Sequence, residues 1–152
     1  MWRTSSGIFI INGVLAISRN IPPARIIGAG TDIIEIERIK QAYERSGDRF
    51  LERVFTPGER SFCDARRDRF SCYAARFAAK EAVLKALGTG LAGCSFVDVE
   101  VSRPGGGRPE VTLHGAAAET AKEKGIASIL ISISHNRESA VAFAIAAGEE
   151  VL

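Results

Sequence analysis

Hydrophobic and polar positions along this chain follow two different periods. In the first half, apolar residues recur every three to four positions, which is the spacing of an amphipathic helix. In the second half, they alternate with polar residues or form short apolar runs, which is typical of strands. The patterns predict helices over 35–45, 49–54, 57–67, 71–87 and 115–124, and strands over 26–34, 96–101, 110–113, 128–134 and 139–147.

The segment 71–87 is the strongest helix candidate. Alanine and leucine dominate it, no glycine or proline interrupts it, and Gly88 follows as a stop. Apolar residues surround its whole circumference, which predicts a largely buried helix. The helix before it has its own start signal, because Thr56 can cap it, Pro57 suits its first turn and Glu59 can complete a capping box.

Length and composition narrow the class of protein. A chain of 152 residues fits one domain, and 46% apolar with 25% charged residues is ordinary for a globular protein. The net charge of +2 gives no support for nucleic-acid binding, and no apolar run approaches the ~20 residues of a membrane helix. Cys63, Cys72 and Cys94 are odd in number and lack CxxC spacing. This argues against a disulfide framework or a zinc site and predicts a reducing, cytoplasmic location.

Residues 1–25 differ from the rest of the chain. The run 8–17 is apolar, but Asn12 and Gly13 interrupt it, and no clear cleavage site follows. We expect an extension outside the core, joined through a linker-like Asn-Ile-Pro-Pro, with 26–152 as the domain. An extra strand packed on the domain and a targeting peptide are the alternatives.

The segment GAGTD at 28–32 holds the first candidate for chemistry. Its glycines do not complete the dinucleotide-binding fingerprint, because Ile33 occupies the third glycine position. We therefore expect the glycines to permit close backbone packing. Asp32 is a carboxylate inside an apolar run, and such a position is costly unless the group is paired or binds a metal.

The helix at 71–87 carries the second candidate carboxylate. Phe77, Glu81 and Lys85 fall on one stripe of it. Glu81 and Lys85 alone would form a simple helix pair, but charges along a mostly buried helix favour a functional site. Two carboxylates from different segments suit Mg²⁺, which completes its coordination with water and phosphate oxygens. With Lys85, they indicate metal-assisted chemistry on a phosphate ester.

Three further segments carry polar groups. The glycine loop Gly88-Thr89-Gly90 offers backbone amides to a phosphate. Ser134 and His135 could act as nucleophile and base, but no third partner is evident, so phosphate or nucleotide binding is the alternative. The arginine-rich stretch 38–69 could dock an acidic partner, or it could be a solvated face, because acidic residues are interleaved.

These segments together resemble the holo-acyl-carrier-protein synthase family, the small class of phosphopantetheinyl transferases. The resemblance covers about residues 26–147 of the chain. It rests on GAGTDIIEIERI at 28–39, RFLERVFTPGE at 49–59, RFAAKEAVLKALGTG at 76–90, DVEV at 98–101, GRPEVTLHG at 107–115 and SISH at 132–135.

The resemblance implies an α+β fold in which the long helix packs on an antiparallel sheet, and a homotrimer with active sites between subunits. It implies transfer of the 4′-phosphopantetheine group of coenzyme A to a serine of acyl carrier protein, a step needed for fatty acid biosynthesis. Adenosine 3′,5′-bisphosphate would be released. A non-catalytic trimeric scaffold and a hydrolase acting on coenzyme A are the alternatives.

The resemblance also implies roles for individual residues. Mg²⁺ held by Asp32 and Glu81 would bridge the pyrophosphate, and Glu81 or a metal-held water would take the serine proton. Lys85 would neutralise the leaving phosphate. The nucleotide would contact Lys80, Lys85, Gly88, Thr89, Gly90, Ser134 and His135, and the carrier protein would contact Arg38, Arg45 and Arg53.

Overall fold

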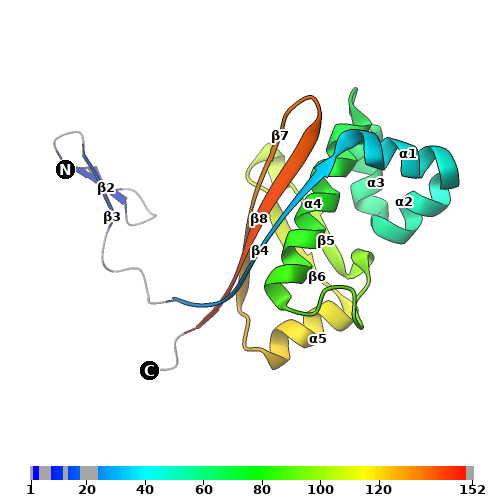
Figure 1. Cartoon of the computed structure of the whole chain (residues 1–152). Helices are drawn as coiled ribbons and strands as arrows, with labels where there is room; N and C mark the ends of the chain where they lie inside the picture. Colours follow the sequence, from blue (N-terminus) through cyan, green and yellow to red (C-terminus); the bar gives the residue numbers. More distant parts are fainter. Residues whose placement is uncertain (1, 4–7, 12–13, 18–23, 150–152) are drawn as a thin grey trace.

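A three-stranded antiparallel sheet forms one face of the domain (Figure 1). The structure, a computed structural model, describes residues 2–3, 8–11, 14–17 and 24–149. The sheet has the order β4-β8-β7, and the two long strands pair along their whole length. All three strands were predicted, and each extends one or two residues beyond the predicted bounds. They are β4 (Ala24–Glu35), β7 (Ser128–His135) and β8 (Ser139–Glu149).

The long helix α4 (Arg69–Leu87) packs on this sheet and is largely buried, as its apolar circumference predicted. Small side chains on both sides allow a close approach, because alanine dominates the contact. The alanines of α4 are Ala74, Ala75, Ala78, Ala79, Ala82 and Ala86, and those at alternate positions of β8 are Ala140, Ala142, Ala144 and Ala146, all of them buried. Gly88 ends the helix in the left-handed conformation, with φ of 78°.

Three shorter helices, α1 (Ile36–Ser46), α2 (Asp48–Val54) and α3 (Pro57–Asp64), precede α4. The predicted capping box of α3 is confirmed. The Glu59 amide donates to Thr56 Oγ1 at 3.3 Å, and the Thr56 amide donates to Glu59 Oε2 at 2.8 Å. The helix ends at residue 64 rather than 67, because the chain turns there to start α4. Asp68 caps that next helix by accepting from the Ser71 amide.

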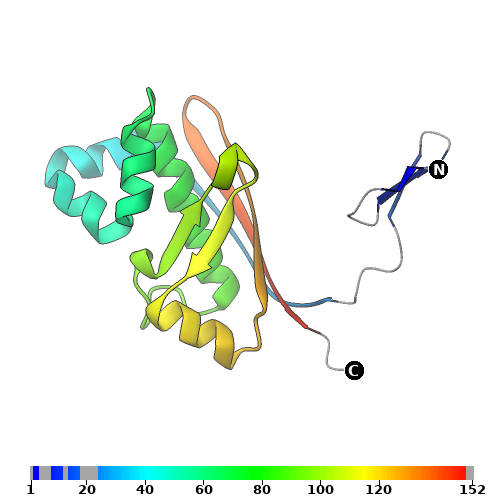
Figure 2. The same cartoon turned by 180° about the vertical axis from the view of Figure 1, so that it is seen from behind.

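A hairpin and one helix cover the other side of α4 (Figure 2). The hairpin pairs β5 (Val99–Ser102) with β6 (Glu110–Leu113), and the helix is α5 (Gly115–Glu123). The predicted strand from residue 96 instead opens with a 3-10 turn, η1 (Phe96–Asp98). Asp98 Oδ2 accepts from the Ser95 amide at 2.9 Å, which bends the chain before β5. A second 3-10 turn, η2 (Pro104–Gly106), forms the glycine-rich hairpin tip.

The N-terminal strands form a separate small sheet of order β1-β2-β3. They are β1 (Trp2–Arg3), β2 (Ile8–Ile11) and β3 (Val14–Ile17), and they pair only with one another. The predicted linker at 20–23 lies outside the described residues. In the part of the chain that the structure describes, no helix is long and apolar enough to cross a membrane.

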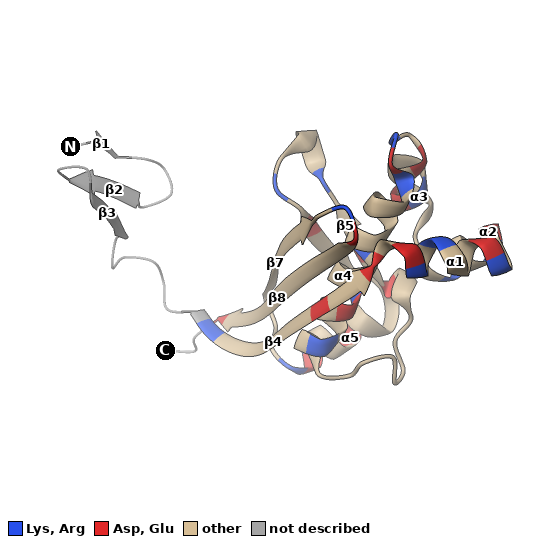
Figure 3. Cartoon of the chain, turned by 45° about the horizontal axis from the view of Figure 1, so that its top comes forward, with Lys and Arg blue, Asp and Glu red and all other residues tan. Residues whose placement is uncertain are grey.

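The sheet face away from α4 exposes large apolar side chains. Because side chains alternate across a strand, the same strands that bury alanines against α4 turn other residues outward. Ile33 and Leu130 are more than half exposed, and Val141 and Phe143 of the central strand are 39% and 45% exposed. Charged residues gather instead on α1, α2 and α3, whereas β7 and β8 carry few (Figure 3). This face is an unusually apolar surface.

Candidate active site

Two glycines of β4 bring α4 close to that strand. A Cβ atom at Gly28 or Gly30 would lie 2.0 Å from the carbonyl oxygen of Ala86 or Ala82. No side chain fits at that distance, so only glycine allows this approach. The prediction that these glycines serve close packing is confirmed.

Asp32 follows these glycines on the same face of β4 and meets the end of α4. Its Oδ1 lies 3.0 Å from Lys85 Nζ, which also donates to the carbonyl oxygen of Thr31 at 2.8 Å. The Asp32 side chain is 18% exposed and that of Lys85 50% exposed. The fold therefore brings Asp32 and Lys85 together in a partly open position that solvent can reach.

Glu81 lies one helical turn before Lys85 and in the electrostatic field of Asp32. Burial raises the pKa of Glu81, the charge of Asp32 raises it further, and Lys85 opposes both. The two carboxylates are thus close enough to repel each other. A cation between them would remove that repulsion.

These donors fit a magnesium ion. Among the described residues, no group of three or more His, Cys, Asp or Glu side chains could hold a metal by itself. Mg²⁺ commonly takes one or two protein carboxylates and fills its other positions with water and substrate phosphate oxygens. Asp32 and Glu81 supply two carboxylates, and their partial exposure leaves room for such ligands.

Lys80 lies elsewhere, in the interior. It is fully buried, with Nζ 2.6 Å from Glu59 Oε2, 2.8 Å from the Val54 carbonyl oxygen and 3.1 Å from that of Phe96. Burial lowers the pKa of Lys80, and the Glu59 carboxylate opposes that shift. All three donors of its ammonium group are engaged. The prediction that Lys80 contacts the nucleotide does not fit this position, and we do not retain it.

The loop Gly88-Thr89-Gly90 forms the end of α4. The Gly88 amide donates to the carbonyl oxygens of Leu84 and Lys85, and the Gly90 amide donates to that of Leu84. These amides are therefore not free to bind a phosphate. Thr89 Oγ1 remains available for a substrate, since it makes only a 3.3 Å contact to the Gly90 carbonyl oxygen and a 3.8 Å contact to Cys94 Sγ.

A basic cavity of about 350 Å³ lies on the other side of α4. The turn between α3 and α4, the first half of α4, the β5–β6 hairpin and the end of β7 form its walls. Of the two residues predicted to contact the nucleotide from β7, His135 lines the cavity and Ser134 does not. Ser134 is exposed, and because side chains alternate along β7 it lies on the opposite face of the strand from Ile133 and His135. The charged and polar lining residues are Arg66, Arg67, Asp68, Ser71, Arg76, Ser102, Arg103 and His135.

Arg76 is the most informative residue of this cavity. It is only 7% exposed, and burial lowers the pKa of its guanidinium group. Its guanidinium carbon lies 4.2 Å from the centre of the Phe62 ring, and one nitrogen donates to Cys72 Sγ at 3.1 Å. Its Nε has no hydrogen-bond partner. The Glu59 carboxylate partly opposes the lowering of the Arg76 pKa. A buried cation with a free donor beside an open cavity is suited to an anionic ligand.

The sequence did not identify most of this cavity. Arg66, Arg67 and Arg103 looked like members of a solvated charged stretch or a flexible turn. The signal that could have identified Arg76 was present, because it is the only arginine within the apolar segment 71–87.

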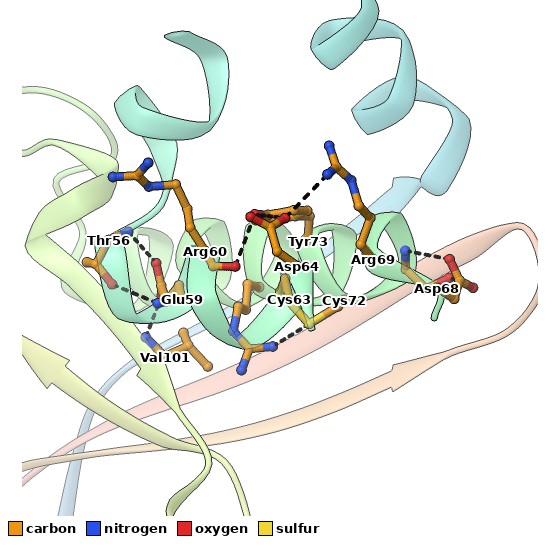
Figure 4. The surroundings of a disulfide bond; sticks show 12 residues. Thr56, Glu59, Arg60, Cys63, Asp64, Asp68, Arg69, Cys72, Tyr73 and Val101 are labelled. Carbon is orange, nitrogen blue, oxygen red and sulfur yellow. Dashed lines mark hydrogen bonds and ion pairs between the residues drawn. A yellow bond between two sulfur atoms is a disulfide. The ribbon is translucent and has the colours of Figure 1, made fainter. Parts of the chain in front are cut away.

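A disulfide joins Cys63 and Cys72 at the edge of the cavity (Figure 4). The expectation of no disulfide was therefore wrong. Cys63 lies in the last turn of α3 and Cys72 in the first turn of α4, and the sharp turn between these helices brings their Cα atoms within 5.4 Å. Sequence spacing alone does not reveal this approach. Cys94 is free and buried.

Comparison with known proteins identifies the family. Residues 28–144 match the model of the 4'-phosphopantetheinyl transferase superfamily, so the chain belongs to this superfamily. Within it, the chain groups with the holo-[acyl-carrier-protein] synthases. It is 55% identical to that of Desulforudis audaxviator over 123 residues, which cover 81% of this chain and 94% of that protein.

Solved structures of the same group have the same fold. The crystal structure of holo-ACP-synthase from Plasmodium yoelii is 34% identical, with a TM-score of 0.74, and the match covers 84% of this chain and 99% of that one. The Helicobacter pylori holo-[acyl-carrier-protein] synthase in complex with coenzyme A is 34% identical, with a TM-score of 0.69, over 78% of this chain and 98% of that one. The predicted α+β fold, with an antiparallel sheet against a long buried helix, is confirmed.

Proposed function

We propose that this chain is a holo-[acyl-carrier-protein] synthase. It transfers the 4′-phosphopantetheine group of coenzyme A to a serine of apo acyl carrier protein, as fatty acid biosynthesis requires, and releases adenosine 3′,5′-bisphosphate. The observation that carries the proposal is the cluster of Asp32, Glu81 and Lys85, which presents two coupled carboxylates and an ammonium group to solvent. The coenzyme A complex of the Helicobacter pylori relative supports the same substrate.

The residues of this cluster have separate tasks in the transfer. The serine oxygen attacks the phosphorus that carries pantetheine, and the bond to the phosphate of the adenosine part breaks. A magnesium ion bound by Asp32 and Glu81 would supply positive charge to the pyrophosphate oxygens. Lys85, held by Asp32, neutralises charge on the leaving phosphate. Glu81, or a water held near the metal, takes the serine proton.

The basic cavity is the proposed site of the adenosine 3′,5′-bisphosphate part of coenzyme A. Its size suits a small ligand. Arg66, Arg67 and Arg76 supply charges for phosphate groups, and His135 adds a further polar contact.

The carboxylates and the cavity lie on different sides of α4. Arg76 and Glu81 are five residues apart, which is about 140° around a helix. Glu81 lies beside Asp32 of β4, at one sheet edge, whereas the cavity includes His135 of β7, at the other edge. We therefore propose that the complete site forms between copies of this chain, in a homotrimer, with the exposed apolar sheet face between the subunits.

Mixing two inactive variants tests this arrangement. Asp32→Ala removes one carboxylate, and Arg76→Gln removes the buried cation of the cavity. If each site combines groups from two copies, trimers assembled from both variants contain some intact sites and regain activity. The proposal is contradicted if the reassembled mixture stays inactive. It is also contradicted if sedimentation shows that the wild-type chain is a monomer.

The carrier-protein surface is proposed to be Arg38, Arg45 and Arg53 on α1 and α2. All three side chains are exposed. In the part of the chain that the structure describes, none of them lies within 4.0 Å of a carboxylate oxygen, so their charges are available to an acidic partner.

The two alternatives make different predictions for carrier protein. A hydrolase would release adenosine 3′,5′-bisphosphate from coenzyme A without carrier protein, and a scaffold would release none. Chromatography of the nucleotide products with and without apo carrier protein distinguishes the transferase, the hydrolase and the scaffold. Release that does not depend on carrier protein overturns the proposed transfer.

Two further proposals concern the chain as a whole. We propose that residues 26–152 are the catalytic domain and that deleting residues 1–25 preserves activity. A large loss of soluble, active protein would show the opposite. We also propose a cytoplasmic location, where acyl carrier protein is the acceptor. The Cys63–Cys72 disulfide removes the argument from cysteine content, so the location rests on the proposed substrates.

A further inference from the structure

The pair of Glu59 and Lys80 is the only fully buried ion pair among the described residues. The two side chains are 1% and 0% exposed, and Nζ lies 2.6 Å from Oε2. Burying two charges costs so much desolvation energy that such pairs contribute little net stability. This pair therefore calls for an explanation other than stability.

The two side chains of the pair make hydrogen bonds to four backbone groups. Lys80 donates to the carbonyl oxygens of Val54, at the end of α2, and Phe96, before β5. Glu59 accepts from the amides of Thr56, before α3, and Val101, on β5 (Figure 4). The pair is thus a fixed junction that joins α4 to α2, α3 and the β5 hairpin.

The helix that holds Lys80 is tied to α3 at its first turn by the Cys63–Cys72 disulfide and to β4 near its end by Lys85 and Asp32, and the Glu59–Lys80 pair fixes the stretch between them. Alanines dominate the contact of α4 with β8 on both sides. Because their side chains are short and do not interlock, this contact resists rotation or sliding of the helix only weakly. The ion pair and its four hydrogen bonds to backbone groups together favour one rotation of the helix. The next residue along α4 is Glu81, which points about 100° away from Lys80 and meets Asp32 on β4.

We propose that Glu59 and Lys80 are positioning residues that set the rotation of α4 and so hold Glu81 opposite Asp32. This inference rests on the metal site of the proposed function. Mg²⁺ demands near-ideal ligand geometry, so a small rotation of α4 weakens binding even when the protein stays folded. Groups that orient a metal ligand typically change metal affinity by about 10–100-fold.

The test measures metal binding without catalysis. Mn²⁺ alone is titrated into the wild-type protein and each variant, and the paramagnetic broadening of backbone amide signals is followed by NMR. In the wild type, broadening should centre on Asp32 and Glu81. Broadening that centres elsewhere shows that the metal site itself is wrong, which overturns the proposed function together with this inference.

The decisive variant is the double substitution Glu59→Gln with Lys80→Met. It removes both charges of the pair together, so neither partner is left charged and alone in the interior, and it nearly keeps the volume of both side chains. We expect at least about a tenfold loss of Mn²⁺ affinity. The single variant Lys80→Met should lose Mn²⁺ affinity and also stability, because it leaves Glu59 buried without a partner.

Val83→Ala is the matched control. Val83 is fully buried in the same helix and uncharged, so this variant loses stability without removing the junction. Its Mn²⁺ affinity should stay within about twofold of the wild type, in contrast to a residue that orients a ligand. Wild-type Mn²⁺ affinity in the double variant, or an equal loss in Val83→Ala, overturns the positioning role.

Discussion

Lys85 Nζ lies 3.0 Å from Asp32 Oδ1, across the contact between α4 and β4. The approach depends on Gly28 and Gly30, whose missing side chains let the helix carbonyls lie against the strand. The motif around Asp32 and the motif around Glu81 are about fifty residues apart in sequence, and this packing joins them into one cluster. A metal ion at Asp32 would share that carboxylate with Lys85.

Removing either carboxylate should abolish transfer. We expect Asp32→Ala and Glu81→Ala each to lower the rate by more than about 100-fold while the circular dichroism spectrum stays native, because a single cation depends on both ligands. The rate is measured by mass spectrometry of the carrier protein. EDTA should have the same effect on the wild type, and transfer that survives complete chelation contradicts the metal site.

The raised pKa of Glu81 predicts a pH-dependent stability. Because its pKa is higher in the folded chain than in the unfolded one, ionisation of Glu81 opposes folding. This cost is fully present above the folded-state pKa and disappears below about 4.3, the ordinary value for glutamate. Glu81→Gln should therefore raise the Tm near pH ~7 in EDTA, by an amount that vanishes near pH ~4.

Thermal unfolding across this pH range measures the effect. Glu119→Gln, an exposed glutamate of α5, is the control and should give no pH-dependent gain. If Glu81→Gln raises the Tm equally at low and at neutral pH, the stabilisation does not come from the ionisation of Glu81.

Reversing charges on α1 should affect carrier protein selectively. Arg38 and Arg45 are exposed and seven residues apart, so they project from one face of the helix. Replacing both by glutamate should lower kcat/KM for carrier protein by about tenfold or more, flatten its salt dependence and leave coenzyme A binding nearly unchanged. Lys122→Glu, on α5, is the control. Steady-state kinetics with each substrate varied in turn measures both effects. If only kcat/KM for coenzyme A falls, the docking surface lies elsewhere.

Breaking the Cys63–Cys72 disulfide should weaken both the fold and the cavity. The bond closes a loop of about ten residues, for which a loss of about 2–3 kcal/mol is expected. The loop carries Arg66 and Arg67, so affinity for adenosine 3′,5′-bisphosphate should fall as well. Denaturant unfolding and calorimetry with and without a dithiol reductant measure these effects. Cys94→Ser should still respond to the reductant, whereas Cys63→Ser with Cys72→Ser should not.

The elements were predictable from sequence because their signals are local. The capping box of Thr56 and Glu59, the alanine-rich α4 and the stop at Gly88 depend only on neighbouring residues. The pairing of Asp32 with the Glu81 stripe was also within reach, because both carboxylates stand out against apolar surroundings.

The remaining features depend on tertiary packing. The burial of Lys80, the disulfide and the Arg76 cavity arise where α3, α4 and β5 meet, and no local pattern encodes that meeting. Lys80 and Lys85 look alike in sequence, yet one is fully buried and the other half exposed. Their different roles follow from the fold alone.

The most direct test of the proposed transfer is mass spectrometry of apo acyl carrier protein after incubation with this protein, coenzyme A and Mg²⁺. The account predicts that the carrier protein gains the mass of one phosphopantetheine group on a serine, and that an equal amount of adenosine 3′,5′-bisphosphate appears. An unchanged carrier-protein mass with folded wild-type protein would contradict the account.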